Sequence, residues 1–157
     1  MRIGIGYDSH RFAEGRRLVL AGVEIPFDRG LTGHSDADVV AHAVTDALLG
    51  AAALGDIGTH FPPDSPTWKD ADSIELLRSV VGMLGARGYR VGNVDVTVIC
   101  EAPRIGPYVE AMRAGLADAL GVGVGEVSIK GKSNEGMGWI GRGEGIAALA
   151  VAVLLGR

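Results

Sequence analysis

The segment from Ser35 to Leu54 places the strongest constraint on the fold. Its spacing predicts a helix whose alanines, valines and leucines run nearly all the way round. Ser35 followed by Asp38 resembles an N-terminal capping box, with Asp in place of the usual Glu. A helix that is apolar on most sides needs packing partners on more than one of them. We therefore expect this helix to be buried on several faces.

The clearest strand is predicted at 91–101, where Val94, Val96, Val98 and Cys100 alternate with more polar residues. The segment 143–155 is ambiguous between helix and strand. The irregular alternation of elements favours an α+β fold, a mixed or antiparallel sheet with helices on one face in a two-layer sandwich. The other predicted elements are strands at 2–8, 17–21, 23–25 and 127–131, a helix at 72–87 with Asp72 as N-cap and Gly88 after its end, and a helix at 107–120 opened by Pro107.

Glycine is unusually frequent, with 25 among 157 residues. A collagen-like period is absent, and a hydrophobic content of 47% argues against disorder. Many tight turns and close backbone approaches are the remaining explanation. The length fits one domain, 1–157, with a sizeable core.

Several classes of protein are disfavoured by the same sequence. A net charge of −4 argues against a nucleic-acid surface. The longest apolar run, 146–155, is too short to span a bilayer, and the N-terminus lacks the apolar stretch of a signal peptide. Cys100 is the single cysteine, so an internal disulfide and a cysteine-based zinc cluster are excluded. We expect a reducing, cytoplasmic location.

Asp8 and His10 form the first candidate site. They lie two residues apart at a strand end, so their side chains point to the same side, and both residue types bind zinc. The alternative is a strand exit with a capping Asp.

Asp38, His42 and Asp46 are spaced four residues apart and share one helix face. A buried, hydrogen-bonded histidine is one interpretation. The other adds His42 to the two ligands at the strand end, which makes three protein ligands with an open position, the arrangement of a catalytic zinc. Asp38 or Asp46 would then orient His42 from behind.

Two glycine-rich segments complete the candidates. The turn at 55–58 favours a helix C-cap with Gly55 left-handed, although Asp56 is also suited to substrate hydroxyls. The segment 130–145 suits phosphate through its lysines, arginine and exposed backbone N–H groups, and Glu135 suits a cation such as Mg²⁺. A simple hairpin is the alternative there. Neither a P-loop nor a Rossmann motif is present, and His60 receives no role.

Taken together and in order, these motifs resemble those of the 2-C-methyl-D-erythritol 2,4-cyclodiphosphate synthase family of the non-mevalonate isoprenoid pathway. The resemblance covers essentially the whole chain. The sequence motifs that carry it are Asp8-x-His10, 34–39, His42, 45–50, 55–58 with Phe61-Pro62 and Asp64, 92–95, Ala102-Pro103 and 141–145.

This resemblance implies a metal-assisted cyclisation. The 2-phosphate of 4-diphosphocytidyl-2-C-methyl-D-erythritol 2-phosphate attacks the β-phosphate, which yields the cyclic diphosphate and releases CMP. It further implies a homotrimer around a central sheet-lined cavity, with active sites between subunits. Neither nucleic acid nor membrane is a partner.

The resemblance also implies roles for particular residues. Zn²⁺ is held by Asp8, His10 and His42, and a second divalent cation, Mg²⁺ or Mn²⁺, by Glu135. His34 and Ser133 stabilise the transition state. The substrate-binding set is Asp8, His10, His34, Ser35, Asp56, Ile57, Gly58, Phe61, Asp64, Ser65, Cys100, Ala102, Pro103, Arg104, Ile105, Gly106, Lys132, Ser133, Asn134 and Glu135, with Trp139 and Arg142 at the central cavity.

The chain departs from the common family pattern in places. Ser133 keeps the hydroxyl of the usual Thr, whereas Arg104 and Gly106 change the loop expected to hold cytidine, and Trp139 stands where Phe is common. Two competing functions remain open. One is a zinc phosphohydrolase with Asp38 or Asp56 as base for a water. The other is a trimeric small-ligand binding protein that uses the cavity at Trp139 and Arg142.

Overall fold

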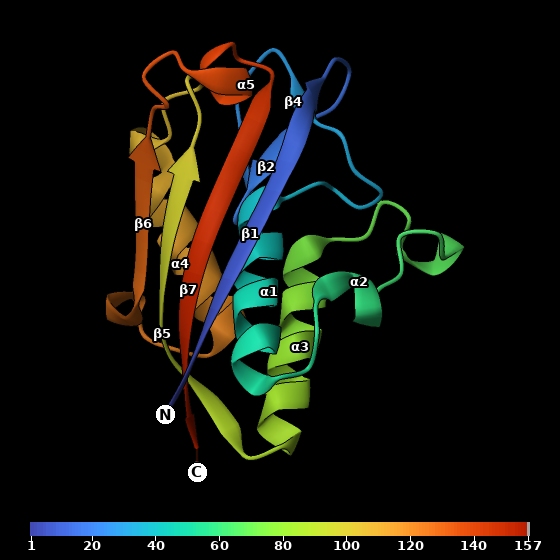
Figure 1. Ribbon diagram of the computed structural model, residues 1–157, viewed down its shortest axis with the longest axis vertical. Helices are drawn as coiled ribbons and strands as arrows, with labels where there is room; N and C mark the ends of the chain where they lie inside the picture. The colour runs from blue at the N-terminus through green and yellow to red at the C-terminus, as the bar shows by residue number, and fades with distance from the viewer. Residues whose placement is uncertain (157) are drawn as a thin grey trace.

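The computed structural model describes residues 1–156; Arg157, the last residue of the expected single domain, lies outside them. A five-stranded sheet of order β4-β1-β7-β5-β6 carries the helices α1, α3 and α4 on one face (Figure 1). Strands β5 and β6 are parallel and the other pairs antiparallel, which confirms the expected mixed sheet of an α+β fold. The strands of this sheet are β1 (Arg2–Ala13), β4 (Gly30–Leu31), β5 (Tyr89–Ile99), β6 (Val127–Lys132) and β7 (Gly145–Gly156), and β2 (Leu18–Leu20) pairs with β3 (Val23–Ile25).

The ambiguous C-terminal segment is the central strand β7. It pairs with β1 on one side and β5 on the other, so its backbone groups are hydrogen-bonded along both edges. Ile146, Ala148, Ala150, Ala152 and Leu154 are buried under the helices. The period of two was hidden in the sequence because the opposite face of β7 is apolar as well.

That opposite face of the sheet is exposed in the single chain. Ile3, Ile5 and Tyr7 of β1 are 64%, 66% and 55% exposed, and Leu149 and Val151 of β7 are also exposed. We refer to these five residues as the apolar sheet face. A monomeric protein rarely leaves such a contiguous apolar surface uncovered.

Helix α1 (Val39–Ala52) begins four residues later than predicted. Asp38 is its N-cap and accepts hydrogen bonds from the N–H groups of Val40 and Ala41. The capping box at Ser35 is therefore wrong, because Ala37 has a positive φ of 59° and the chain cannot be helical before it. The C-cap is Ala53, also left-handed, rather than Gly55.

Helix α1 lies directly against β1. A Cβ at Gly4 or Gly6 would collide with the carbonyl oxygens of Ala47 and Ala43, so only glycine allows this approach. The helix is buried on nearly all sides, as predicted, since β1, β7 and α3 all contact it.

The other predicted helices and strands are confirmed apart from their ends, and several short elements were not predicted. The alternation of β5 is confirmed, with Val94, Val96 and Val98 buried. None of the helices within residues 1–156 has the length and hydropathy needed to cross a bilayer. The other helices are α2 (Ile57–His60), α3 (Ser73–Ala86, N-cap Asp72, followed by left-handed Gly88), α4 (Val109–Leu120) and α5 (Gly138–Gly141), with single turns η1 (Pro66–Trp68), η2 (Gly106–Tyr108) and η3 (Val124–Glu126).

Candidate active site

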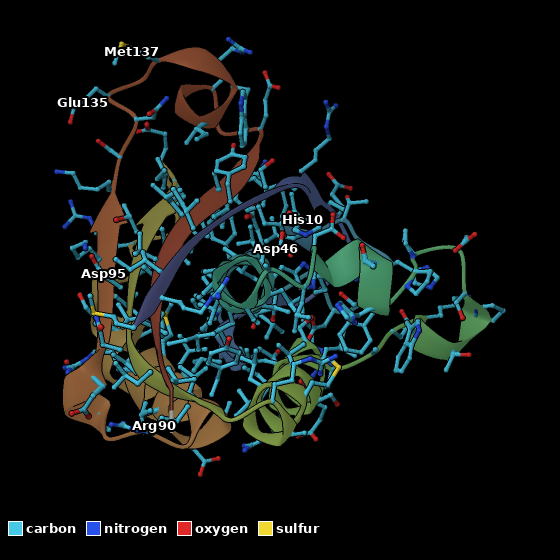
Figure 2. All side chains as sticks on the ribbon, turned by 60° about the horizontal axis from the view of Figure 1, so that its bottom comes forward. His10, Asp46, Arg90, Asp95, Glu135 and Met137 are labelled. Atoms are coloured by element: carbon cyan, nitrogen blue, oxygen red, sulfur yellow. The ribbon has the colours of Figure 1, made fainter. Side chains whose placement is uncertain are left out.

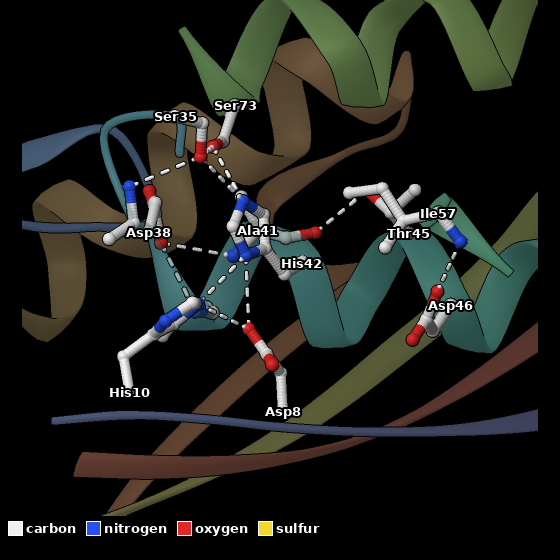
Figure 3. Close-up of polar contacts among 12 residues, drawn as sticks. Asp8, His10, Ser35, Asp38, Ala41, His42, Thr45, Asp46, Ile57 and Ser73 are labelled. Atoms are coloured by element: carbon white, nitrogen blue, oxygen red, sulfur yellow. Dashed lines mark hydrogen bonds and ion pairs between the residues drawn. The ribbon is translucent and has the colours of Figure 1, made fainter. Parts of the chain in front are cut away.

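Asp8, His10 and His42 form a compact cluster whose ligand atoms all lie within 4.8 Å of one another. Asp8 Oδ2 is 2.9 Å from His10 Nε2 and 3.0 Å from His42 Nδ1, and the two imidazole nitrogens are 3.1 Å apart (Figure 3). One carboxylate and two imidazoles suit zinc, and three protein ligands leave a fourth position for substrate. The cluster can therefore hold a metal ion, as the sequence predicted.

The backbone explains why these side chains meet. Asp8 and His10 continue the face of β1 that carries Gly4 and Gly6, and this face is covered by α1. His42 lies in the first turn of α1, above the strand end. The close helix–strand contact brings ligands from both elements together.

The interactions within the cluster favour a negatively charged Asp8 carboxylate beside a positively charged His42 imidazole. Burial raises the pKa of Asp8, but hydrogen bonds from His10 and His42 outweigh it and lower the pKa to about 2. Burial lowers the pKa of His42, but the hydrogen bond and charge of Asp8 outweigh it, so this pKa is raised.

These shifts predict a pH dependence for the metal-free protein. The contribution of Asp8, about 2 kcal/mol, is present above its unfolded pKa of 3.8 and lost as the pH falls to about 2. The contribution of His42 is present below 6.5 and lost as the pH rises through its raised folded pKa. Denaturation measured after a chelator has removed any metal should show that Asp8→Asn lowers the unfolding free energy most between pH 3.8 and the raised pKa of His42. An equal effect of Asp8→Asn at all pH values would contradict the assignment.

The side chains behind His42 differ from those expected. Asp38 and Asp46 do not orient the ring, because the Asp38 carboxylate caps α1 and Asp46 Oδ1 accepts the Ile57 N–H at 2.7 Å. His42 Nε2 instead faces the hydroxyls of Ser73 and Ser35, at 2.9 Å and 3.1 Å. Ser73 carried no signal in the sequence beyond its place at a predicted helix start.

A cavity of about 230 Å³ opens beside the cluster. Phe61 and Trp68 form part of its wall and pack edge to face with their ring centroids 5.0 Å apart. Trp68 was missed by sequence reasoning, although an aromatic residue in a polar loop was an available signal. The predicted substrate residues that line this cavity are Asp8, His10, His34, Ser35, Ile57, Gly58 and Phe61, and the unpredicted ones are Pro63, Trp68 and Leu76.

Asp56, Asp64 and Ser65 are placed next to this cavity rather than in its wall. Asp56 caps α2 by accepting from the N–H and hydroxyl of Thr59, and these bonds lower the pKa of Asp56. The cap at the turn 55–58 thus belongs to the following helix, not the preceding one. The Ser65 carbonyl lies 3.0 Å from His34 Nε2, which ties the loop to the cavity.

A second cavity, of about 480 Å³, lies where β5 and β6 end. These strands are parallel neighbours, so the loops that follow them emerge at the same edge of the sheet. Burial and Glu101 raise the pKa of the Cys100 thiol to about 11, so this cysteine is not a reactive thiolate. The predicted residues that line this cavity are Cys100, Pro103, Arg104, Ile105, Gly106, Lys132 and Ser133; Ala102 precedes a cis peptide bond to Pro103.

Glu135 lies in the exposed loop beyond β6. The Ser133 hydroxyl donates to Glu135 Oε1 at 3.0 Å. Glu101, which sequence reasoning missed, fixes the loop by accepting from the N–H groups of Asn134 (2.8 Å) and Gly136 (3.3 Å). Among the described residues, Glu135 Oε2 has no hydrogen-bond partner, and the residue bonded to Oε1, Ser133, lines the second cavity.

The predicted site residues fall into two groups, one at the metal cluster and one at the second cavity, and these groups do not meet within one chain. The two cavities share no lining residue, and Figure 2 shows Glu135 on a loop well away from His10. Trp139 lines a third cavity of about 340 Å³ with Ser9, Arg11 and others, whereas Arg142 pairs with Glu144 at 2.6 Å.

A mixed sheet with an Asp–His–His cluster beneath its helix layer, beside a cavity, is an arrangement suited to an enzyme that binds a metal ion. The family model described as the YgbB family matches residues 1–155, and the chain belongs to this family. A 2-C-methyl-D-erythritol 2,4-cyclodiphosphate synthase of Symbiobacterium thermophilum is 62% identical over the full length of both chains.

Solved structures agree with this assignment. The bifunctional IspDF of Campylobacter jejuni superposes with a TM-score of 0.96 at 39% identity, covering 99% of this chain and 42% of that one. The IspF–CDP complex of Plasmodium falciparum superposes with a TM-score of 0.87 at 33% identity, covering 99% and 96%.

Proposed function

We infer that the chain makes 2-C-methyl-D-erythritol 2,4-cyclodiphosphate in the non-mevalonate isoprenoid pathway. The substrate is 4-diphosphocytidyl-2-C-methyl-D-erythritol 2-phosphate, and CMP is released, which makes the enzyme a cyclising phosphorus–oxygen lyase. The observation that carries this proposal is the Asp8–His10–His42 cluster at a cavity, in a chain 62% identical to a synthase of that name.

In the proposed reaction, an oxygen of the 2-phosphate forms a bond to the β-phosphorus. The bond from that phosphorus to the CMP oxygen breaks, and CMP leaves with the electron pair. The attacking phosphate is already an anion and tethered, so no general base is needed and the protein mainly fixes a folded conformer. When bound, Zn²⁺ at the cluster and Mg²⁺ or Mn²⁺ at Glu135 supply positive charge to the phosphate oxygens.

The roles of the protein's own groups follow from their chemistry. To stabilise the transition state, the Ser133 hydroxyl would exchange Glu135 Oε1, and His34 Nε2 the Ser65 carbonyl, for substrate oxygens that gain charge. Lys132 and Arg104 place positive charge at the second cavity, which suits the phosphates of a cytidine nucleotide. The Ile57, Gly58 and Phe61 wall beside the cluster holds the methylerythritol.

The same proposal requires a homotrimer. A site whose halves lie in separate cavities is completed when a second copy brings its Glu135 loop to the metal cluster of the first. The apolar sheet face supports this arrangement, because three copies that pack these faces around an axis would cover Ile3, Ile5 and Tyr7 and enclose a sheet-lined cavity. Trp139 and Arg142 would then lie near that axis.

A cytoplasmic location completes the proposal. It is supported by Cys100, a buried free thiol and the single cysteine of the sequence.

Product analysis tests the function. Purified protein incubated with the diphosphocytidyl substrate and Mg²⁺ should release CMP together with the cyclic diphosphate. CMP with a linear, hydrolysed erythritol product would instead identify a phosphohydrolase. Of the two candidate bases of that alternative, Asp38 is buried and caps α1, whereas Asp56 is exposed and caps α2 through Oδ1.

Light scattering tests the assembly on the same sample. We expect a mass three times the 16.2 kDa of one chain. A mass of one chain at working concentration would contradict the shared site.

A further inference from the structure

The face of His42 that points away from the metal cluster has its own hydrogen-bond network. Ser73 is the first residue of α3 and is 1% exposed, and its hydroxyl lies 2.9 Å from His42 Nε2 (Figure 3). Ser35 Oγ lies 3.1 Å from the same nitrogen. His42 is thus held from one side by the cluster and from the other by two serines.

The direction of these hydrogen bonds follows from Asp36. Its Oδ2 accepts from the Ser73 N–H at 3.1 Å and its Oδ1 from the Asp38 N–H at 3.1 Å, so both oxygens act as acceptors. The Ser73 hydroxyl donates its hydrogen to Asp36 Oδ1. A hydroxyl has one hydrogen, so Ser73 Oγ can only accept from His42.

His42 Nε2 therefore carries a hydrogen, which it donates to Ser73 Oγ. Nδ1 faces Asp8 and His10, so once a metal ion displaces the hydrogen that Nδ1 shares with Asp8, its lone pair points at the ion. Since the two nitrogens cannot exchange roles without breaking the bond to Ser73, the network selects one tautomer and one ring orientation.

We propose that Ser73 and Asp36 are positioning residues for the metal site: Asp36 orients the Ser73 hydroxyl, and Ser73 holds His42 with Nδ1 free for the ion. This proposal rests on the proposed function only in taking zinc as the ion. Hydrogen bonds of this kind behind a metal-bound histidine keep its ring in place and raise its basicity.

Ser35 is a weaker candidate for this role. It lines the cavity, and its hydroxyl also accepts from the Ala37 N–H at 3.2 Å. Ser73 is held by Asp36 through both its N–H and its hydroxyl. We therefore expect the larger effect at Ser73.

Zinc affinity is the first test, measured by competition with a chromophoric chelator. Ser73→Ala should weaken zinc binding roughly 10- to 100-fold, and Ser73→Thr, which keeps the hydroxyl, should recover most of it. Ser79→Ala is the matched control, because Ser79 lies on the same helix and is exposed, and among the described residues its hydroxyl donates only to the Glu75 carbonyl. An affinity of folded Ser73→Ala within about twofold of the original protein would overturn the proposal.

Two further readouts separate positioning from a general structural role. In zinc-loaded protein with labelled histidines, long-range ¹H–¹⁵N spectra should show the hydrogen of His42 on Nε2, and a hydrogen on Nδ1 would overturn the proposal. In the Ser73→Ala background, Asp36→Ala should change zinc affinity by less than about twofold, because Asp36 acts through Ser73. If Asp36→Ala weakened zinc binding in the Ser73→Ala background as much as it does alone, the two residues would act independently, which contradicts the proposal.

These measurements do not depend on turnover. A protein that gives the expected zinc and NMR results but no cyclic product contradicts the proposed function alone. One that makes the product with unchanged zinc affinity in Ser73→Ala contradicts the positioning proposal alone.

Discussion

His42→Ala is expected to lose zinc and most turnover. The substitution leaves two ligands, Asp8 and His10, and removes the one ligand supplied by α1. Because partners behind a ligand are each worth roughly 10- to 100-fold in metal affinity, removal of the ligand itself should weaken zinc binding by more than about 100-fold. Metal analysis after dialysis and product formation from the diphosphocytidyl substrate measure the two effects.

His60→Ala is the matched control for that result. His60 lies outside the cluster, and its Nε2 contacts only the Leu54 carbonyl at 2.9 Å among the described residues. We expect it to retain zinc. Full zinc occupancy in His42→Ala would refute the ligand assignment. If this variant lost zinc but still bound a small ligand at the cavity of Trp139 and Arg142 as the original protein does, a small-ligand binding protein would be favoured.

Asp38→Ala is expected to produce the largest loss of stability. The Asp38 carboxylate is fully buried and accepts from four N–H groups, those of Ala21, Gly22, Val40 and Ala41. Burial raises the pKa of Asp38, and the N–H bonds oppose that shift. The substitution leaves these buried donors without a partner, so the unfolding free energy should fall by at least about 3 kcal/mol, measured by chemical denaturation.

Asp72→Ala provides the comparison. Asp72 caps α3 in the same way but is exposed, and its carboxylate accepts only from the Ile74 N–H among the described residues. A cap of this kind contributes about 1 kcal/mol. An equal loss of stability in Asp38→Ala and Asp72→Ala would mean that the hydrogen bonds from Ala21 and Gly22 to Asp38 add nothing to the unfolding free energy.

The metal ligands were predictable because each follows a local period. Asp8 and His10 share a strand face, and His42 lies on a helix whose apolar pattern was plain. The partners of His42 were not predictable, since Asp36 and Ser73 come from separate loop and helix-start positions with no period between them. Helical spacing made Asp38 one of two candidates to orient His42, but its carboxylate instead accepts from two N–H groups at the start of α1 and two in the β2–β3 turn.

For the second cavity, the sequence predicted the residues but not their position relative to the metal cluster. The resemblance grouped residues 100–106 with Lys132 as the cytidine and phosphate pocket, and the parallel pairing of β5 with β6 brings most of them to one cavity, together with Ser133. Nothing in the order of residues shows that this cavity and the metal cluster lie apart in one chain. The strand β7 was ambiguous for a related reason, because a strand that is apolar on both faces has no visible period.

The contact of Gly4 and Gly6 with α1 also bears on which ion the cluster accepts. Two ligands come from β1 and one from α1, so the helix-to-strand spacing sets the radius of the ligand sphere. An added methyl group at either glycine would push the helix outward and widen that sphere. Zinc needs ligand bonds of roughly 2.0–2.2 Å, whereas calcium takes roughly 2.3–2.6 Å. Two residues outside the ligand set thus determine how closely His42 can approach Asp8 and His10.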